Sequence, residues 1–267
     1  ESISQASANQ RSGRCGRLGP GVCIRLYGEE DFKSRPRFTT PEIRRTNLAS
    51  VILQTRALRL GSIEDFPFIE MPSSESIRDG YRTLFEIGAL DHRRDLTPLG
   101  KQLSRLPVDP RIGRILYAGS EEGCLAEVLV IASALEIQDP RVRPAERQAE
   151  ADEAHGKFAD ERSDFLGKLN LWNWLHERKE TLSRSQFRKA CAQNYLSYML
   201  VQQWMDIYRQ LRSLCRDHRL HWASDPDNYD AIHQSLLTGL LSGVAMRTER
   251  REYTGQGGVK FSLWPGS

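Results

Sequence analysis

Apolar residues recur every three or four positions through most of the second half of the chain, which is the spacing of one face of an α-helix. The longest such stripe follows residues 183–185 and predicts one long helix that crosses a whole domain. Its members are Phe187, Cys191, Tyr195, Tyr198, Val201, Met205, Tyr208, Leu211 and Cys215. We interpret this stripe as the core of a helical bundle. Further helices are expected over residues 111–121, 125–136 and 164–175, and from Tyr229 onward.

Other parts of this pattern predict loops and strands. Segment 140–161 is charged and contains few large apolar residues, so we expect a loop or a loosely held helix there. Near the start, apolar and polar positions alternate over residues 22–27 enough to predict a strand. At the other end, residues 247–264 become strand-like and rich in turns, with glycines at 255, 257 and 258.

Between residues 42 and 104 the pattern is typical of a winged-helix domain. The expected order is helix, helix, short hairpin, helix, over residues 42–60, 74–87, 89–97 and 98–104. Gly88 ends the second helix because glycine tolerates the left-handed conformation at a helix C-terminus. Arg45 and Arg56 are expected on one polar face of the first helix.

Composition narrows the class of protein only a little. The 267 residues are enough for one to three domains, and 39% hydrophobic with 27% charged residues is ordinary for a soluble globular protein. A net charge of +3 barely favours a nucleic-acid partner. No apolar run is long enough for a transmembrane helix. The chain begins at Glu1 without an initiator methionine, so we expect it to be a piece of a longer protein.

The cysteines indicate a reduced, cytoplasmic environment. There are five, with no closely spaced pair, which fits free thiols better than disulfides. Cys215, His218 and His221 fall three positions apart near a helix end, but no fourth ligand is in sight. We therefore predict no metal site, and interpret this group as a core cysteine beside surface histidines.

The most informative stretch is Gln10-Arg11-Ser12-Gly13-Arg14-Cys15-Gly16-Arg17. Three arginines at every third position, separated by glycines, suit neither a core nor a stable helix, because glycine weakens a helix by about 1 kcal/mol relative to alanine. Several guanidinium groups that converge on one anion would explain the arrangement. Phosphate is the natural target for the planar, permanently charged arginine side chain.

This stretch resembles motif VI of the DEAH-box RNA helicases, Q-R-x-G-R-x-G-R, at every fixed position. The resemblance continues in the family's order along most of the chain, over residues 6–9, 19–27, 41–48, 96–100, 106–111 and 163–166. Residues 194–198 and 206–211 are most similar to the bacterial HrpA-type branch. The resemblance implies a mostly α fold in four parts. These are the end of a RecA-like α/β domain (1–39), a winged-helix domain (40–106), a helical bundle or ratchet domain (107–235) and the incomplete start of an OB-fold (236–267).

The resemblance also implies roles at an ATP site. Gln10 would position the attacking water, Arg14 and Arg17 would reach the γ-phosphate, and Arg11 would support the loop beside the phosphates. Positive charge there suits phosphoryl transfer, in which negative charge develops on the transferred group. ATP and Mg²⁺ would be bound mainly by another motor domain.

The letters Asp152-Glu153-Ala154-His155 spell DEAH but are not expected to be the helicase Mg²⁺ motif, which follows a buried strand. Here the preceding residues, Glu146 to Ala151, cannot form one. The sequence also contains no G-x-x-x-x-G-K-[ST] loop. We therefore predict that this chain alone has no ATPase activity.

The same resemblance implies a monomer whose partner is single-stranded or structured RNA, such as messenger RNA, ribosomal RNA or the ribosome. No membrane partner is expected. An RNA path could be lined by Arg141, Arg143, Arg147, Arg184, Arg188 and Lys189, although acidic residues nearby allow a merely solvated surface. Two alternatives stay open. One is a non-enzymatic winged-helix module that binds nucleic acid, and the other is a helical scaffold for protein partners.

Overall fold

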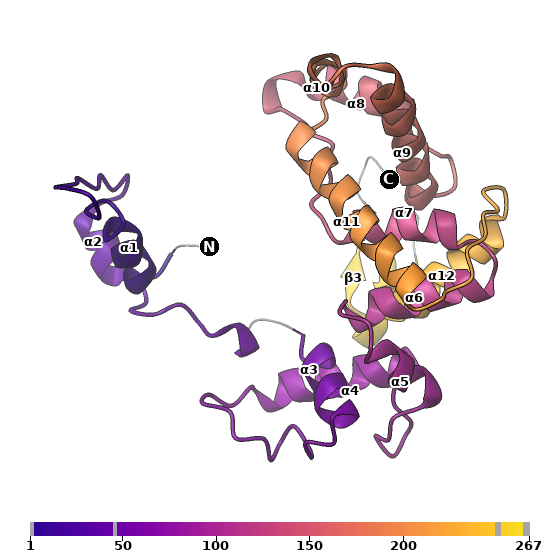
Figure 1. Cartoon of the computed structure of the whole chain (residues 1–267), viewed down its shortest axis with the longest axis horizontal. Coiled ribbons are helices and arrows are strands. Elements are labelled where there is room, and N and C mark those ends of the chain that lie inside the picture. Colours follow the sequence, from indigo (N-terminus) through magenta and orange to yellow (C-terminus); the bar gives the residue numbers. More distant parts are fainter. Residues whose placement is uncertain (1–2, 45–46, 249–251, 264–267) are drawn as a thin grey trace.

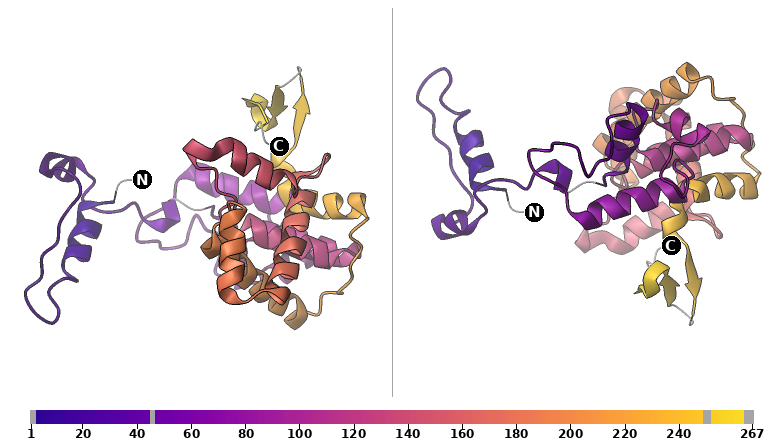
Figure 2. Two further views of the ribbon diagram at one scale, coloured as in Figure 1. Left: turned by 90° about the horizontal axis from the view of Figure 1, so that it is seen from above. Right: turned by 90° about the horizontal axis from the view of Figure 1, so that it is seen from below.

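A computed structural model describes residues 3–44, 47–248 and 252–263. Figure 1 shows a largely helical molecule in which the first two helices stand apart from the rest, joined to it by an extended segment. Figure 2 shows a small C-terminal sheet that projects from the helical body. Three residues named above lie outside the described residues. They are Arg45 of the predicted helix over 42–60, Thr46 of the family segment 41–48, and Trp264 at the end of the strand-like segment.

The N-terminal part contains helices α1 (Gln5–Ser12) and α2 (Glu29–Ser34). Ser4 caps α1 by accepting a hydrogen bond from the N–H of Ser7. The start of α1 is tied to the end of this part, since the N–H of Gln5 donates to the carbonyl of Pro36 at 3.0 Å.

The predicted strand over residues 22–27 is wrong. These residues form no regular structure, and the Val22 and Ile24 side chains are 85% and 81% exposed. A strand exists only where a neighbouring strand takes up its backbone hydrogen bonds. In the part of the chain that the structure describes, no strand pairs with this segment.

The winged-helix part contains the 3₁₀ turn η1 (Glu42–Arg44) and helices α3 (Ala49–Ala57), α4 (Ser74–Glu86) and α5 (Pro98–Leu103). The short hairpin is present as a bridge between Leu90 and Leu96. Gly88 adopts φ +73°, which confirms it as the end of the second helix. The predicted helix over 42–60 is wrong in extent, because the Asn47 side chain accepts the N–H of Ala49 at 2.8 Å and α3 starts there.

The largest core belongs to a bundle of α6 (Pro110–Glu121), α7 (Leu125–Leu135), α9 (Asp164–Thr181), α10 (Arg184–Gln193), α11 (Tyr198–Asp217) and α12 (Tyr229–Leu240). Trp204 is 1% exposed at its centre. Its indole N–H lies 2.9 Å from the Ser133 hydroxyl and 3.2 Å from the Val130 carbonyl. Helix α12 lies close to α6 at Gly239, where an added Cβ would come within 2.5 Å of the Arg111 carbonyl.

The prediction of one long helix over the stripe from Phe187 to Cys215 is also wrong, because α10 and α11 are separate. Tyr195 adopts φ +52° between them. The backbone there bonds to a distant segment: the Val142 N–H donates to the Tyr195 carbonyl, and the Ser197 N–H to the Pro140 carbonyl, each at 2.8 Å. These tertiary hydrogen bonds replace helical ones, and Ser197 then caps α11.

Segment 140–161 contains the 3₁₀ turn η2 (Ala145–Arg147) and helix α8 (Gln148–Gly156). Ala151 and His155 of α8 are buried, so this helix is held by the bundle.

After α12 come η3 (Leu241–Gly243), β1 (Ala245–Arg247), β2 (Tyr253–Gly255), η4 (Gln256–Gly258) and β3 (Lys260–Phe261). The three strands pair antiparallel in chain order, which confirms the strand-like pattern over the described residues of this segment.

Candidate nucleotide and nucleic-acid sites

The arginine-rich stretch forms the end of helix α1 and the turn that follows it. Gln10 and Arg11 lie on the last turn of α1, whereas Arg14 and Arg17 lie in the irregular segment beyond Gly13. All four side chains are exposed. The helix therefore fixes the first two residues, and the turn presents the other two to the surroundings.

Glycine is required just after this stretch. A Cβ added to Gly21 would lie 1.8 Å from the carbonyl oxygen of Cys15, so the chain folds back on itself where a side chain could not fit. Gly13 and Gly16 are less restricted, with nearest contacts of 3.5 Å and 3.9 Å. A close backbone approach thus occurs at Gly21 rather than inside the stretch.

The other arginines of the N-terminal part are engaged within the molecule. Arg25 donates to the Asn9 side chain at 2.8 Å and lies 4.1 Å from the centre of the Phe32 ring. Arg35 pairs with Asp31 at 2.6 Å and lies over the Tyr27 ring. Such contacts orient the loop, and they occupy the guanidinium groups that make them.

Arg11, Arg14 and Arg17 differ from these. Within the described residues, none of their side chains has a hydrogen bond, an ion pair or a ring contact. We call these three residues the free arginines. An exposed loop that carries free guanidinium groups can bind an anion without first breaking an internal contact.

The free arginines suit the phosphate groups of a nucleotide, but they cannot hold its metal ion. Magnesium needs carboxylate and other oxygen ligands. No cluster of His, Cys, Asp or Glu suited to a metal ion occurs in the described parts of the chain.

The DEAH letters at 152–155 have internal roles. They lie in helix α8 and not at the end of a strand. Asp152 pairs with Arg143 at 2.6 Å, and the His155 imidazole bonds to the Tyr195 carbonyl at 3.2 Å. Both contacts hold α8 against neighbouring segments.

The trio Cys215, His218 and His221 does not converge on one point. Cys215 is 2% exposed, and burial raises the pKa of its thiol to about 11, so the thiolate that would bind a metal is disfavoured. His218 ends α11, and the backbone N–H of His221 donates to the Ser120 hydroxyl.

The basic residues proposed for an RNA path fall into two groups. The first is engaged: Arg141 pairs with Asp139 at 2.7 Å, Arg143 pairs with Asp152, and Arg147 lies beside the Tyr195 hydroxyl, which donates to Glu150. The second group is Arg184, Arg188 and Lys189 on α10. These three are exposed and have no side-chain partner among the described residues, and they border one groove.

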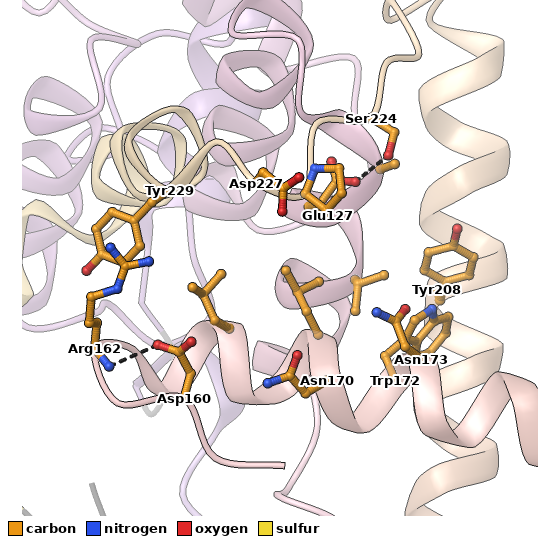
Figure 3. A pocket seen from close by; sticks show the side chains of 15 residues that line it. Glu127, Asp160, Arg162, Asn170, Trp172, Asn173, Tyr208, Ser224, Asp227 and Tyr229 are labelled. Carbon is orange, nitrogen blue, oxygen red and sulfur yellow. Dashed lines mark hydrogen bonds between the residues drawn. The ribbon is translucent and has the colours of Figure 1, made fainter. Parts of the chain in front are cut away.

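A pocket of about 560 Å³ lies between α7, α9, α11 and the segment before α12 (Figure 3). The buried carboxylate of Glu127 accepts hydrogen bonds from the Ser224 hydroxyl and, at 3.2 Å, from the Asp225 N–H. Asp160 and Asp227 add negative charge, while Arg162 lies over the Tyr229 ring at 4.4 Å. The acidic lining disfavours phosphate. This pocket was not predicted from the sequence, although Glu127, a charged residue inside the apolar segment 125–135, is a signal for it.

Comparison with known proteins defines the class. Residues 81–108 match the family profile described as helicase associated domain (HA2), winged-helix, and residues 109–191 match its ratchet-like counterpart. The winged-helix and bundle assignments are thereby confirmed.

Relatives extend the match over the whole chain. It is 53% identical over 273 aligned positions to the ATP-dependent RNA helicase HrpA of Escherichia coli, and 49% identical over 275 to the Haemophilus influenzae homologue. The human probable ATP-dependent RNA helicase DHX34 is 38% identical over 87% of the chain. The chain belongs to the DEAH-box RNA helicase family. It covers 21% of the length of each of these three relatives.

Among the described residues, none of the helices combines the length and apolar character needed to span a bilayer.

Proposed function

We propose that this chain is the part of an ATP-dependent RNA helicase that delivers arginines to the ATP site and holds single-stranded RNA while the motor moves. ATP hydrolysis would be coupled to translocation along RNA and to unwinding. The proposed boundaries are the end of a RecA-like domain (1–39), winged helix (40–106), ratchet domain (107–235) and start of an OB-fold (236–267). The helicase names of the relatives and the two helicase-associated profiles support this.

The catalytic part of the proposal depends on the free arginines. Arg14 and Arg17 lie in the turn after α1, and their side chains have no partner among the residues that the structure describes. We infer that they contact the γ-phosphate of ATP on a neighbouring motor domain and stabilise the charge that develops during phosphoryl transfer. Gln10, on the last turn of α1, would orient the attacking water, and Arg11 would contact the phosphates from the same turn.

The metal and the phosphate-binding loop would come from outside this chain, so the chain by itself should not hydrolyse ATP. The purified 267-residue chain tests this directly. No phosphate release above background is expected with or without RNA, and RNA-stimulated hydrolysis would contradict the proposed division of labour.

The RNA bound is proposed to be messenger or ribosomal RNA, by a monomer in the cytoplasm. Contacts would be mostly to phosphates and stacked bases, with little reading of sequence.

The test of the catalytic proposal is ATPase activity of the full-length protein with Arg14→Ala and Arg17→Ala introduced separately. Loss of turnover with RNA binding and thermal stability retained is the expected result. If instead both variants hydrolyse ATP normally but bind RNA more weakly, the stretch is a basic arm. The non-enzymatic winged-helix module would then be the better description.

A further inference from the structure

Helix α10 borders a groove with an unusual distribution of charge. The groove has a volume of about 840 Å³ and is lined by Ser183, Arg184, Ser185, Arg188, Lys189, Ala192 and Tyr198. We propose that this α10 groove binds the phosphodiester backbone of single-stranded RNA. The proposal deepens the RNA-binding function above and rests on it.

Within the described residues, no acidic side chain neutralises the positive charge of the groove. Between Glu180 and Asp206 the sequence contains no aspartate or glutamate, and the three cations of the groove have no side-chain partner among the described residues. Elsewhere on the bundle, by contrast, Arg209 pairs with Asp206, and Arg141 with Asp139. A purely solvated helix face usually carries charges of both signs.

A rigid helix, α10, presents these cations. Phe187 and Cys191 of α10 are 3% and 0% exposed in the bundle core. At its start, Ser183 and Gln186 form a reciprocal capping box. Because the helix is fixed at its start and along one face, the basic side chains lose little backbone freedom when they bind.

The spacing of the cations suits a single RNA strand. Arg184 and Arg188 are one helical turn apart, about 6 Å along the axis, which allows two guanidinium groups to contact neighbouring phosphates of one strand. Ala192 and Tyr198 line the groove together with the three cations and with Ser183 and Ser185. Tyr198, held edge-on against Phe187, offers a ring face for a base.

The groove is separate from the other candidate sites. Figure 1 shows α10 at the end of the bundle away from α3 and α5, and the acidic pocket of Figure 3 shares no lining residue with it. RNA bound here would therefore be held independently of the arginine loop and of the winged helix.

The test compares two double variants of the 267-residue chain that remove equal charge. R184Q/R188Q empties the groove of its two guanidinium groups. R82Q/R209Q removes two arginines that already pair with Asp79 and Asp206. Binding of fluorescein-labelled oligouridine is measured by anisotropy over a range of salt concentrations, and thermal melting checks folding.

R184Q/R188Q should weaken binding by about tenfold at low salt and reduce the slope of log K against log salt by about 1.4, for two lost phosphate contacts. The control should keep the wild-type slope. Unchanged binding by R184Q/R188Q, or an equal loss in the control, would overturn the α10 site alone. If the wild-type chain does not bind oligouridine, the proposed RNA function fails and this site with it. Tighter binding of poly-glutamate than of oligouridine, abolished in R184Q/R188Q, would identify an acidic protein as the ligand instead.

Discussion

The N-terminal part and the helical bundle are stabilised in different ways. Among described residues up to Thr39, the buried ones are Ser4 and Ala8, and the rest of that part is held by hydrogen bonds and by arginines that pack on rings. The bundle has a continuous apolar core around Trp204. A part with so little buried apolar surface gains little stability from the hydrophobic effect.

The same comparison separates two kinds of cation. Arg25 and Arg141 have internal partners, and their substitution should act on structure. The free arginines and the three cations of the α10 groove have none within the described residues, and their substitution should act on ligands. The predictions below test this distinction.

The largest effect is expected at Arg14. In the full-length protein, Arg14→Ala should lower the ATPase rate by about a thousandfold, which corresponds to about 4 kcal/mol of lost transition-state stabilisation. Arg37→Ala, which removes an exposed side chain near the Phe38 ring, should change it by less than about twofold. Steady-state phosphate release measures both, and equal effects would remove the distinction between free and engaged arginines.

A stability difference should follow from the two kinds of packing. Trp204→Ala deletes a buried side chain together with its hydrogen bonds to Ser133 and Val130, and should cost about 3–5 kcal/mol of unfolding free energy. Ile24→Ala changes a side chain that is 81% exposed and should cost less than about 0.5 kcal/mol. Urea denaturation of the chain measures both values, and similar losses would contradict the assignment of the core.

A smaller effect is expected from backbone conformation alone. Gly123 adopts φ +76° between α6 and α7, with nothing within 4 Å of an added Cβ, so Gly123→Ala should cost about 1–2 kcal/mol through strain. Gly19 is equally open but does not have a positive φ in that range, so Gly19→Ala serves as the control and should be nearly neutral. Thermal melting would show a lower midpoint for the first variant only.

The smallest effect concerns pH. Burial lowers the pKa of His155, although its bond to the Tyr195 carbonyl acts in the opposite direction. The unfolded chain takes up a proton near the ordinary histidine pKa of about 6.5, whereas the folded chain resists protonation until a lower pH. The contribution of neutral His155 to the free energy of unfolding should therefore be fully present above about pH 6.5. It should be lost as the pH falls from there through the pKa of His155 in the folded chain. His155→Gln should lose less stability between about pH 7.5 and about pH 5.5 than the wild-type chain, and identical pH profiles would exclude this role.

Much of the fold was predictable because local signals decide it. Pro98 and Gly88 mark helix boundaries by conformational preference alone, and periodicity identified α4, α6 and α7. The errors lie where distant segments decide. The break at Tyr195 depends on hydrogen bonds to Pro140 and Val142, which local periodicity cannot reveal.

The candidate sites were predictable to a different degree. The arginine stretch is contiguous, so its residue types and spacing were visible in the sequence. Which arginines are free was visible only in part. Asp139 lies two positions before Arg141, but Arg143 and Asp152 are far apart in sequence and meet only in the folded chain. The acidic pocket is assembled from four separate segments and gave only the weak signal of Glu127.

The most direct measurement is a structure of the full-length protein with a nucleotide that mimics the transition state, such as ADP with aluminium fluoride and Mg²⁺. We predict that the guanidinium groups of Arg14 and Arg17 lie within hydrogen-bond distance of the fluoride ligands that replace the γ-phosphate oxygens. Side chains directed away from that group, in a closed nucleotide-bound state, would contradict the account.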